Sequence, residues 1–184
     1  PAQEFEGATI NASITYDPSA DEAAPAAGGV GTTSNSGIAY TLQIAHESGV
    51  EIGGGIEDVE TAGGAATAAD EDSATAYVKY SSGPLSVGYQ EAYQNTLNGG
   101  DDLEAQMWAV AYTAGDLSVS YGESSLSNHG IALVAALETE LESIQASYTM
   151  GSMTIGGAIS ETTNAGRVSG QKHEETELSV SFAF

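Results

Sequence analysis

The chain has 184 residues, a length that suits one domain and leaves little room for a second. Its 3 Lys and Arg against 26 Asp and Glu give a formal net charge of −23, which excludes a nucleic-acid partner because phosphate binding needs a cationic surface. The absence of cysteine excludes a disulfide scaffold, a cysteine-based zinc site and a thiol nucleophile. No run of about 18 apolar residues is present, so no transmembrane helix is expected.

Apolar and polar residues alternate along most of the chain. Between Ala8 and Tyr16 the even-numbered residues are apolar or aromatic, whereas the odd-numbered residues are Thr, Asn and Ser. Successive side chains of a strand point to opposite faces, so this pattern predicts a strand with one apolar and one polar face. A weak helical period at 131–137 leaves a short turn of helix open there. In chain order, the predicted strands are 8–16, 37–45, 50–58, 73–80, 85–93, 103–112, 117–123, 140–148, 153–161 and 175–184.

Short and long connections alternate between these predicted strands. The segments 80–85, 112–117 and 148–153 share one pattern, an aromatic residue followed by four turn residues with Gly third and then an apolar residue. Gly supplies the positive φ of a tight hairpin turn, and a fourth short turn is expected at 46–49. All tight turns therefore fall at one end of the sheet, which is typical of an outer-membrane β-barrel with short periplasmic turns and long external loops. The long, acidic connections are 17–36, 60–72, 94–102, 124–139 and 162–174.

The two rows of side chains differ in what they suit. No charged residue lies among the predicted apolar positions, and the opposite row of Ser, Thr, Gln, Asn and Gly suits a water-lined wall. We therefore predict an all-β, antiparallel, up-and-down transmembrane β-barrel, with a soluble secreted β-protein such as an adhesin as the alternative. Two aromatic girdles at the headgroup levels are expected of such a barrel. They comprise Tyr80, Tyr112, Tyr148 and Phe184 near the short turns, and Tyr16, Tyr40, Tyr89 and Tyr121 near the long loops.

The last predicted strand carries apolar residues at every second position, and the chain ends on an aromatic residue. Leu178, Val180, Phe182 and Phe184 thereby resemble the signal that outer-membrane barrels present to the bacterial barrel-assembly machinery. The stretches 112–122 (Tyr-Thr-Ala-Gly-Asp-Leu-Ser-Val-Ser-Tyr-Gly) and 143–166 resemble alphaproteobacterial porins of the Rhodobacter type. This resemblance extends from about Tyr77 to Phe184 and is fainter before it.

The resemblance implies a homotrimeric, sixteen-stranded diffusion channel in the outer membrane of Gram-negative bacteria, in contact with the lipid bilayer and lipopolysaccharide. Its third external loop would fold into the lumen. The ten predicted strands match the last ten of sixteen, and a closed ten-stranded barrel would be narrow. We therefore expect residues 1–184 to be a single barrel domain, the C-terminal part of a longer porin. The first residues show no basic segment followed by an apolar one, so either a signal peptide has been removed or the chain begins internally.

Lys79 is the only basic residue on a predicted strand. Its parity with Thr75 and Tyr77 directs it into the lumen, where it would face Glu51 or Glu57 on the neighbouring strand. The alternative is a lysine that snorkels near the periplasmic mouth without effect on ion passage. The predicted pore-lining residues are Lys79, Glu51, Glu57, Thr75, Tyr77 and Gln90.

Carboxylates gather in the predicted external loops. Hard oxygen ligands suit Ca²⁺, and the porin resemblance also implies calcium there, although no loop has the ligand spacing of an EF-hand. The alternative is a solvated anionic rim, and in either case the field favours cations at the entrance. No cofactor is required. The candidate metal ligands are Asp70, Glu71, Asp72, Asp101 and Asp102.

These patterns predict a porin that passes ions and small hydrophilic solutes by passive diffusion, with a preference for cations, and not an enzyme. One alternative is a small structural or adhesive barrel with a plugged lumen. Another is an outer-membrane hydrolase that would use His129 or His173 beside Glu123 or Glu174 at the rim, but no specific Asp/His spacing supports it.

Overall fold

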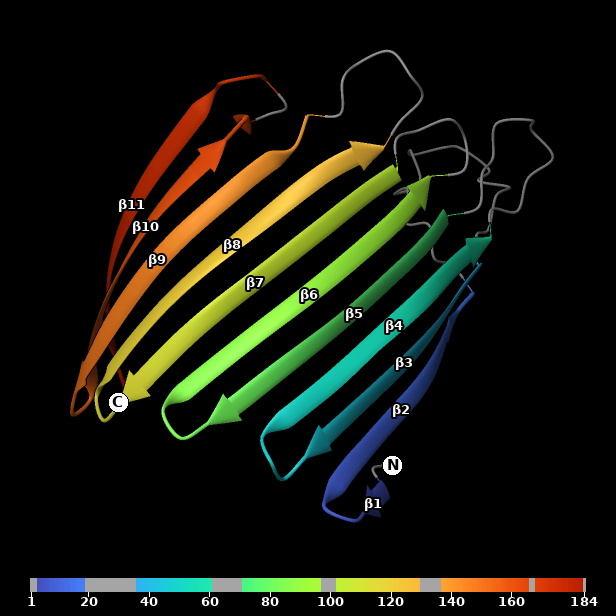
Figure 1. Cartoon of the computed structure of the whole chain (residues 1–184), viewed down its shortest axis with the longest axis horizontal. Helices are drawn as coiled ribbons and strands as arrows, with labels where there is room; N and C mark the ends of the chain where they lie inside the picture. Colours follow the sequence, from blue (N-terminus) through green and yellow to red (C-terminus); the bar gives the residue numbers. More distant parts are fainter. Residues whose placement is uncertain are drawn as a thin grey trace, which may run out of the picture.

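The computed structural model describes residues 3–18, 36–60, 71–96, 102–129, 137–165 and 168–183. In this part of the chain, eleven β-strands form one sheet whose order follows the chain order (Figure 1). The strands are β1 (Gln3–Phe5), β2 (Ala8–Asp17), β3 (Ser36–His46), β4 (Val50–Glu60), β5 (Glu71–Ser82), β6 (Leu85–Thr96), β7 (Asp102–Ala114), β8 (Leu117–His129), β9 (Thr139–Met150), β10 (Met153–Thr163) and β11 (Lys172–Phe182).

Every neighbouring pair in the sheet is antiparallel, so the predicted all-β, up-and-down architecture is confirmed. The ten predicted strands correspond to β2–β11, and the short strand β1 precedes them. Three residues are too short to show alternation. The turn that joins β1 to β2 consists of Glu6 and Gly7, both with positive φ (45° and 79°), as a two-residue hairpin turn requires.

The tight turns lie together at one end of the sheet, and the strand ends that the long connections join lie at the other (Figure 1). Gly83, Gly115 and Gly151 adopt φ of 56°, 58° and 63°, which confirms their predicted role in the hairpin turns. The predicted helical period at 131–137 falls almost wholly outside the described residues. No helix in the described part of the chain is long and apolar enough to cross a membrane.

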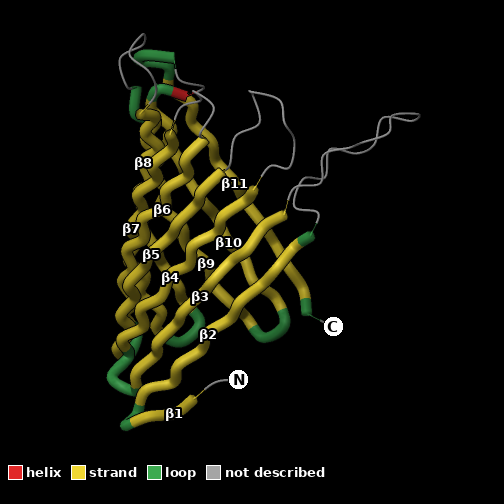
Figure 2. The backbone as a smooth tube through the Cα atoms, turned by 90° about the vertical axis from the view of Figure 1, so that its right-hand side faces the viewer, coloured by secondary structure: helices red, strands yellow, loops and turns green. Residues whose placement is uncertain are grey.

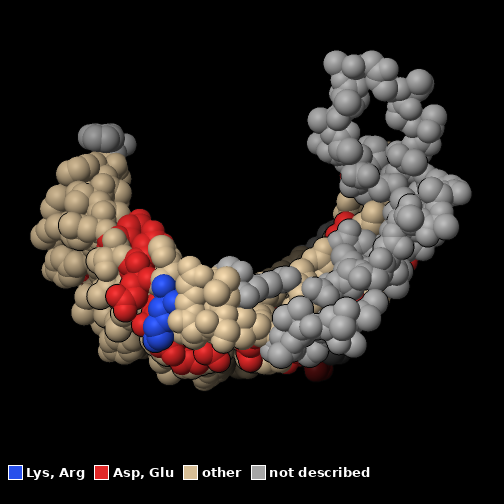
Figure 3. Space-filling model, turned by 90° about the horizontal axis from the view of Figure 1, so that it is seen from above, with Lys and Arg blue, Asp and Glu red and all other residues tan. Residues whose placement is uncertain are grey.

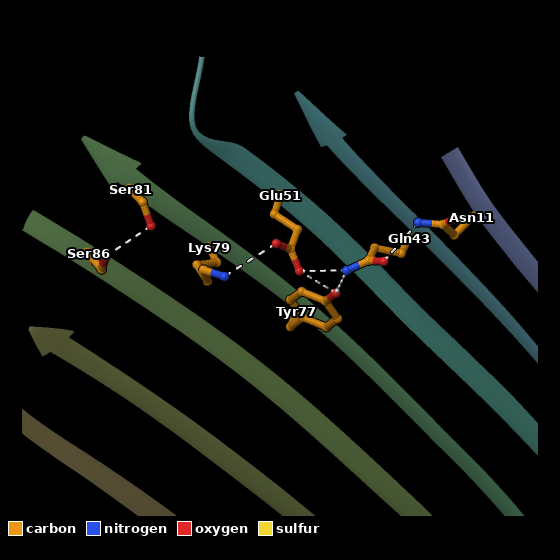
Figure 4. A network of polar contacts seen from close by, with 7 residues as sticks. All are labelled: Asn11, Gln43, Glu51, Tyr77, Lys79, Ser81 and Ser86. Carbon is orange, nitrogen blue, oxygen red and sulfur yellow. Dashed lines mark hydrogen bonds and ion pairs between the residues drawn. The ribbon is translucent and has the colours of Figure 1, made fainter. Parts of the chain in front are cut away.

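The sheet curves into a trough (Figures 2 and 3). The register places the predicted apolar row on one face and the polar row on the other, and the polar side chains point into the concave side (Figure 4). On the convex face, Ile14, Ile56 and Leu178 are 71%, 59% and 78% exposed, and no hydrophobic residue among the described ones is buried. The strands β1 and β11 are the two edges of the sheet, so the described strands do not close a barrel.

Carboxylates also lie on the convex face, which differs from the expectation of a charge-free row. Glu91 lies on the same face as Tyr89, two residues further along β6, and Tyr93 follows it on that face. The register then aligns one glutamate on each of four adjacent strands of this face. The predicted apolar row comprises only the apolar positions of each strand, whereas the strands continue beyond them on the same face with these carboxylates. The aligned glutamates are Glu123, Glu142, Glu161 and Glu174.

Candidate pore-lining site

A hydrogen-bonded network centred on Glu51 crosses the concave face from β2 to β5 (Figure 4). Gln43 Nε2 and Tyr77 Oη donate to Glu51 Oε1 at 2.9 Å and 2.8 Å, and Lys79 Nζ donates to Glu51 Oε2 at 3.3 Å. Asn11 Nδ2 extends the network by donating to Gln43 Oε1 at 3.2 Å. Both oxygens of the Glu51 carboxylate therefore have protein donors.

The strand register brings these residues together. Glu51 lies directly opposite Lys79, and Gly53, two positions further along β4, lies opposite Tyr77. A Cβ at Gly53 would lie 2.7 Å from the Tyr77 ring, which is closer than real contacts allow. The missing side chain of Gly53 thus gives the Tyr77 ring room to lean toward Glu51.

The predicted pore-lining residues all lie on the concave face of β4, β5 and β6. Gln90 Nε2 donates to Thr75 Oγ1 at 3.0 Å, which links β6 to β5. Of the two carboxylates predicted to face Lys79, Glu51 is its partner. Glu57 lies six residues further along β4, opposite Ser73, a distance of about 20 Å along the strand.

The ion pair between Lys79 and Glu51 is open to solvent, with 51% and 23% of the two side chains exposed. Lys79 is the only Lys or Arg on the concave face of the described strands, whereas Glu57, Glu175 and Glu177 lie on that face as well. The concave face is therefore net negative, and one cation is held among its carboxylates.

The candidate metal ligands are only partly described. Asp70 and Asp101 lie outside the described residues. The sequence predicts Glu71, Asp72 and Asp102 in loops, but they belong to strands, because β5 begins at Glu71 and β7 begins at Asp102. Asp102 Oδ2 accepts a hydrogen bond from Tyr93 Oη at 3.1 Å. No group of three or more His, Asp or Glu suited to a metal ion is present among the described residues. Calcium at these loops stays a prediction.

Of the girdle predicted near the short turns, Tyr80, Tyr112 and Tyr148 lie exposed on the convex face at the turn end, and Phe184 lies outside the described residues. The predicted assembly residues Leu178, Val180 and Phe182 also lie exposed on this face, along the edge strand β11.

Aromatic residues near the middle of β6, β7 and β8 donate to carboxylates on the convex face, and the sequence did not predict these contacts. Tyr89 and Tyr121, predicted near the long loops, lie four residues after the turn-end starts of β6 and β8. Tyr89 Oη donates to Glu91 Oε1 at 2.5 Å, and Trp108 Nε1 donates to Glu123 Oε2 at 3.1 Å. Tyr121 Oη donates to the other oxygen of Glu123, and its ring meets Trp108 edge to face at 5.5 Å. The repeated Tyr-x-Glu spacing at 89–91 and 121–123 would have revealed these pairs, because residues two apart share a strand face.

The residues of the hydrolase alternative do not form a site in the described part of the chain. His173 and Glu174 are consecutive in β11, so their side chains point to opposite faces of the sheet. Glu123 is engaged by Trp108 and Tyr121 on the convex face, and the His129 side chain lies outside the described residues.

No protein-family model matches this chain, and no curated protein is similar to it. The resemblance to Rhodobacter-type porins therefore stays a prediction from the sequence.

Proposed function

We propose that this chain forms the wall of a water-filled transmembrane β-barrel in the outer membrane of a Gram-negative bacterium. Ions and small hydrophilic solutes would diffuse passively through it, with a preference for cations. The observation that carries this proposal is the exposure of the large apolar side chains on the convex face, together with the lack of any buried hydrophobic residue among the described ones.

Exposed apolar surface of this extent is costly in water, at about 25 cal/mol per Å². A soluble sandwich or barrel removes that cost by turning its apolar row toward a dry interior. Here the apolar side chains line the outside of the curve and the inside is lined by Ser, Thr, Gln and Glu. The apolar row on the convex side suits contact with lipid hydrocarbon, and the polar row on the concave side suits contact with water.

The open sheet bears on how such a barrel is completed. The edges at β1 and β11 would leave backbone N–H and C=O groups without partners in lipid, which a spanning structure does not tolerate. We propose that further strands close the sheet, as in the sixteen-stranded porins that the sequence resembles. Trimerisation, contact with lipopolysaccharide and delivery by the barrel-assembly machinery follow from the same resemblance and belong to the same proposal.

The preference for cations follows from the charge of the concave face. A channel wall with fixed carboxylates raises the local concentration of cations and repels anions. Lys79 is held by Glu51, so it offsets part of this charge without reversing it.

Conductance in planar lipid bilayers tests the proposal. The full-length protein that carries this chain should produce discrete current steps, and its reversal potential in a salt gradient should indicate cation preference. A protein that inserts without current steps would instead support the plugged structural barrel. A protein that stays in the aqueous phase would support the soluble alternative.

Two neighbouring substitutions on β9 test which face meets lipid. Ile144, near the middle of the strand, lies on the convex face and Ser143 on the concave face. Ile144→Arg places a charge in hydrocarbon and should reduce the free energy of unfolding in vesicles by about 2–4 kcal/mol, whereas Ser143→Arg should leave it nearly unchanged. Equal effects of the two arginines would contradict the proposed orientation.

A further inference from the structure

The concave face is not polar throughout. On β7 its residues are Leu103, Ala105, Met107, Ala109, Ala111 and Thr113, and only Thr113, at the turn end, makes a side-chain hydrogen bond. Diffusion of hydrophilic solutes alone gives no reason for an apolar wall inside a water-filled channel.

A hollow of about 550 Å³ lies against this wall, between β3 and β8. On one side it is lined by Ala92, Leu103, Ala105 and Leu126, and on the other by Glu57. Ser73 and Thr75 of β5 lie between the two. Its volume is in the range of small-molecule sites, which combine a mainly apolar lining with a few polar groups.

Glu57 provides the charge of this hollow. Its side chain is exposed, and the ion pairs formed within the described residues are Lys79 with Glu51 and Lys172 with Glu161, so Glu57 has no cationic partner there. Glu57, Ser73, Gln94 and Leu103 lie in one ladder row. The carboxylate is therefore separated from the leucine by three strand spacings, or about 14 Å.

We propose that this hollow binds small organic cations that carry an alkyl or aryl group, such as alkylammonium ions. The ammonium group lies at the Glu57 carboxylate, and the apolar group lies along the β7 wall at Leu103 and Ala105. The inference rests on the proposed function, because it needs a concave face that is open to water. It adds to that function a class of solute that the channel would concentrate.

A second hollow on the same face offers a matched comparison. It measures about 250 Å³, lies between β8 and β11, and also contains one carboxylate, that of Glu177. Its other side chains include Ser118, Ser120, Gln145 and Ser147 and no large apolar residue. It therefore has a similar charge without the apolar wall, so it should not select alkylammonium ions.

Isothermal titration of the full-length protein in lipid nanodiscs, with empty nanodiscs as the blank, tests the proposal. Tetramethyl-, butyltrimethyl- and hexyltrimethylammonium chloride keep the charge and vary the apolar part. We expect affinity to rise by at least about threefold from the butyl to the hexyl compound. Glu57→Gln should weaken hexyltrimethylammonium binding by about threefold to tenfold, and Glu177→Gln should leave it unchanged. Leu103→Gln should reduce the difference between hexyl and butyl while the tetramethyl compound binds as before.

The outcomes separate this inference from the proposed function. Current steps in planar bilayers without saturable binding of hexyltrimethylammonium would overturn the inference and leave the channel intact. Equal affinity in Glu57→Gln and the unsubstituted protein, or equal affinity for all three ammonium ions, would also overturn it. Absence of current steps would overturn the proposed function, whatever the titration shows.

Discussion

At the scale of single residues, the ion pair with Glu51 gives the positive charge of Lys79 a partner on a concave face that otherwise carries carboxylates. The two side chains are both partly exposed, so water and salt screen their attraction and the pair contributes little to stability. Its effect is on the field in the channel. Removing the positive charge leaves Glu51 uncompensated on the concave face.

Lys79→Glu should therefore raise the preference for cations. The substitution changes the charge of the concave face by two units, and the reversal potential in a salt gradient should shift toward the ideal value for a cation-selective channel. Lys172→Glu is the control, because Lys172 also pairs with a glutamate, Glu161, but lies on the convex face. An unaltered reversal potential in Lys79→Glu would remove this lysine from the pore wall.

The sequence predicted which residues share the concave face but not which of them meet. Parity alone placed Lys79, Glu51 and Glu57 on one side. The choice between the two glutamates depends on the register of β4 against β5, which is set by the turns and by pairing along the whole strands. The close approach of Tyr77 to Gly53 depends on the same register.

At the scale of strands and turns, the hairpin glycines are the clearest determinants of the fold. A Cβ at Gly115 would have no atom within 4 Å, so replacement there strains the backbone and not the packing. With φ at 58°, Gly115→Ala should lower the free energy of unfolding by about 1 kcal/mol, measured by urea unfolding in detergent or vesicles.

Gly88→Ala is the control within a strand. Gly88 does not adopt a positive φ, and its nearest atom to a Cβ would be Val78 O at 3.7 Å, an ordinary contact. This substitution should be neutral or slightly stabilising, because alanine restricts the unfolded chain. A loss at Gly88 as large as that at Gly115 would show that turn geometry is not the cause.

Alternation predicted the ten long strands because each has enough residues to show a period of two. It failed where that signal is short or one-sided. Three residues of β1 carry no period. On β7 the concave row is largely apolar, whereas the convex row begins with Asp102, Glu104 and Gln106, so the polar lining is less uniform than the sequence predicts. The hollow beside Glu57 lies where this departure from alternation occurs.

At the scale of the whole molecule, the formal charge of −23 is unevenly distributed, and one part of it lies in a line on the convex face. Glu123, Glu142, Glu161 and Glu174 stand opposite one another on β8–β11, and only Glu161 has a lysine partner among the described residues. Like charges directly opposite in a sheet are destabilising, by roughly 0.2–1 kcal/mol for each pair. The folded state therefore carries a repulsion that ions in solution can screen.

Raising the NaCl concentration from about 0.05 M to about 0.5 M should raise the midpoint of thermal unfolding by about 3 °C, because three such pairs amount to about 1 kcal/mol. A midpoint that does not change with NaCl would show that the glutamate row causes no net repulsion in the folded protein.

A specific calcium site at the loops should stabilise the protein beyond the general screening of its charges by salt. CaCl₂ should then raise the midpoint of thermal unfolding further than NaCl at equal ionic strength, and ethylenediaminetetraacetate should reverse the gain. Equal midpoints in the two salts would leave a solvated anionic rim and discard the calcium prediction.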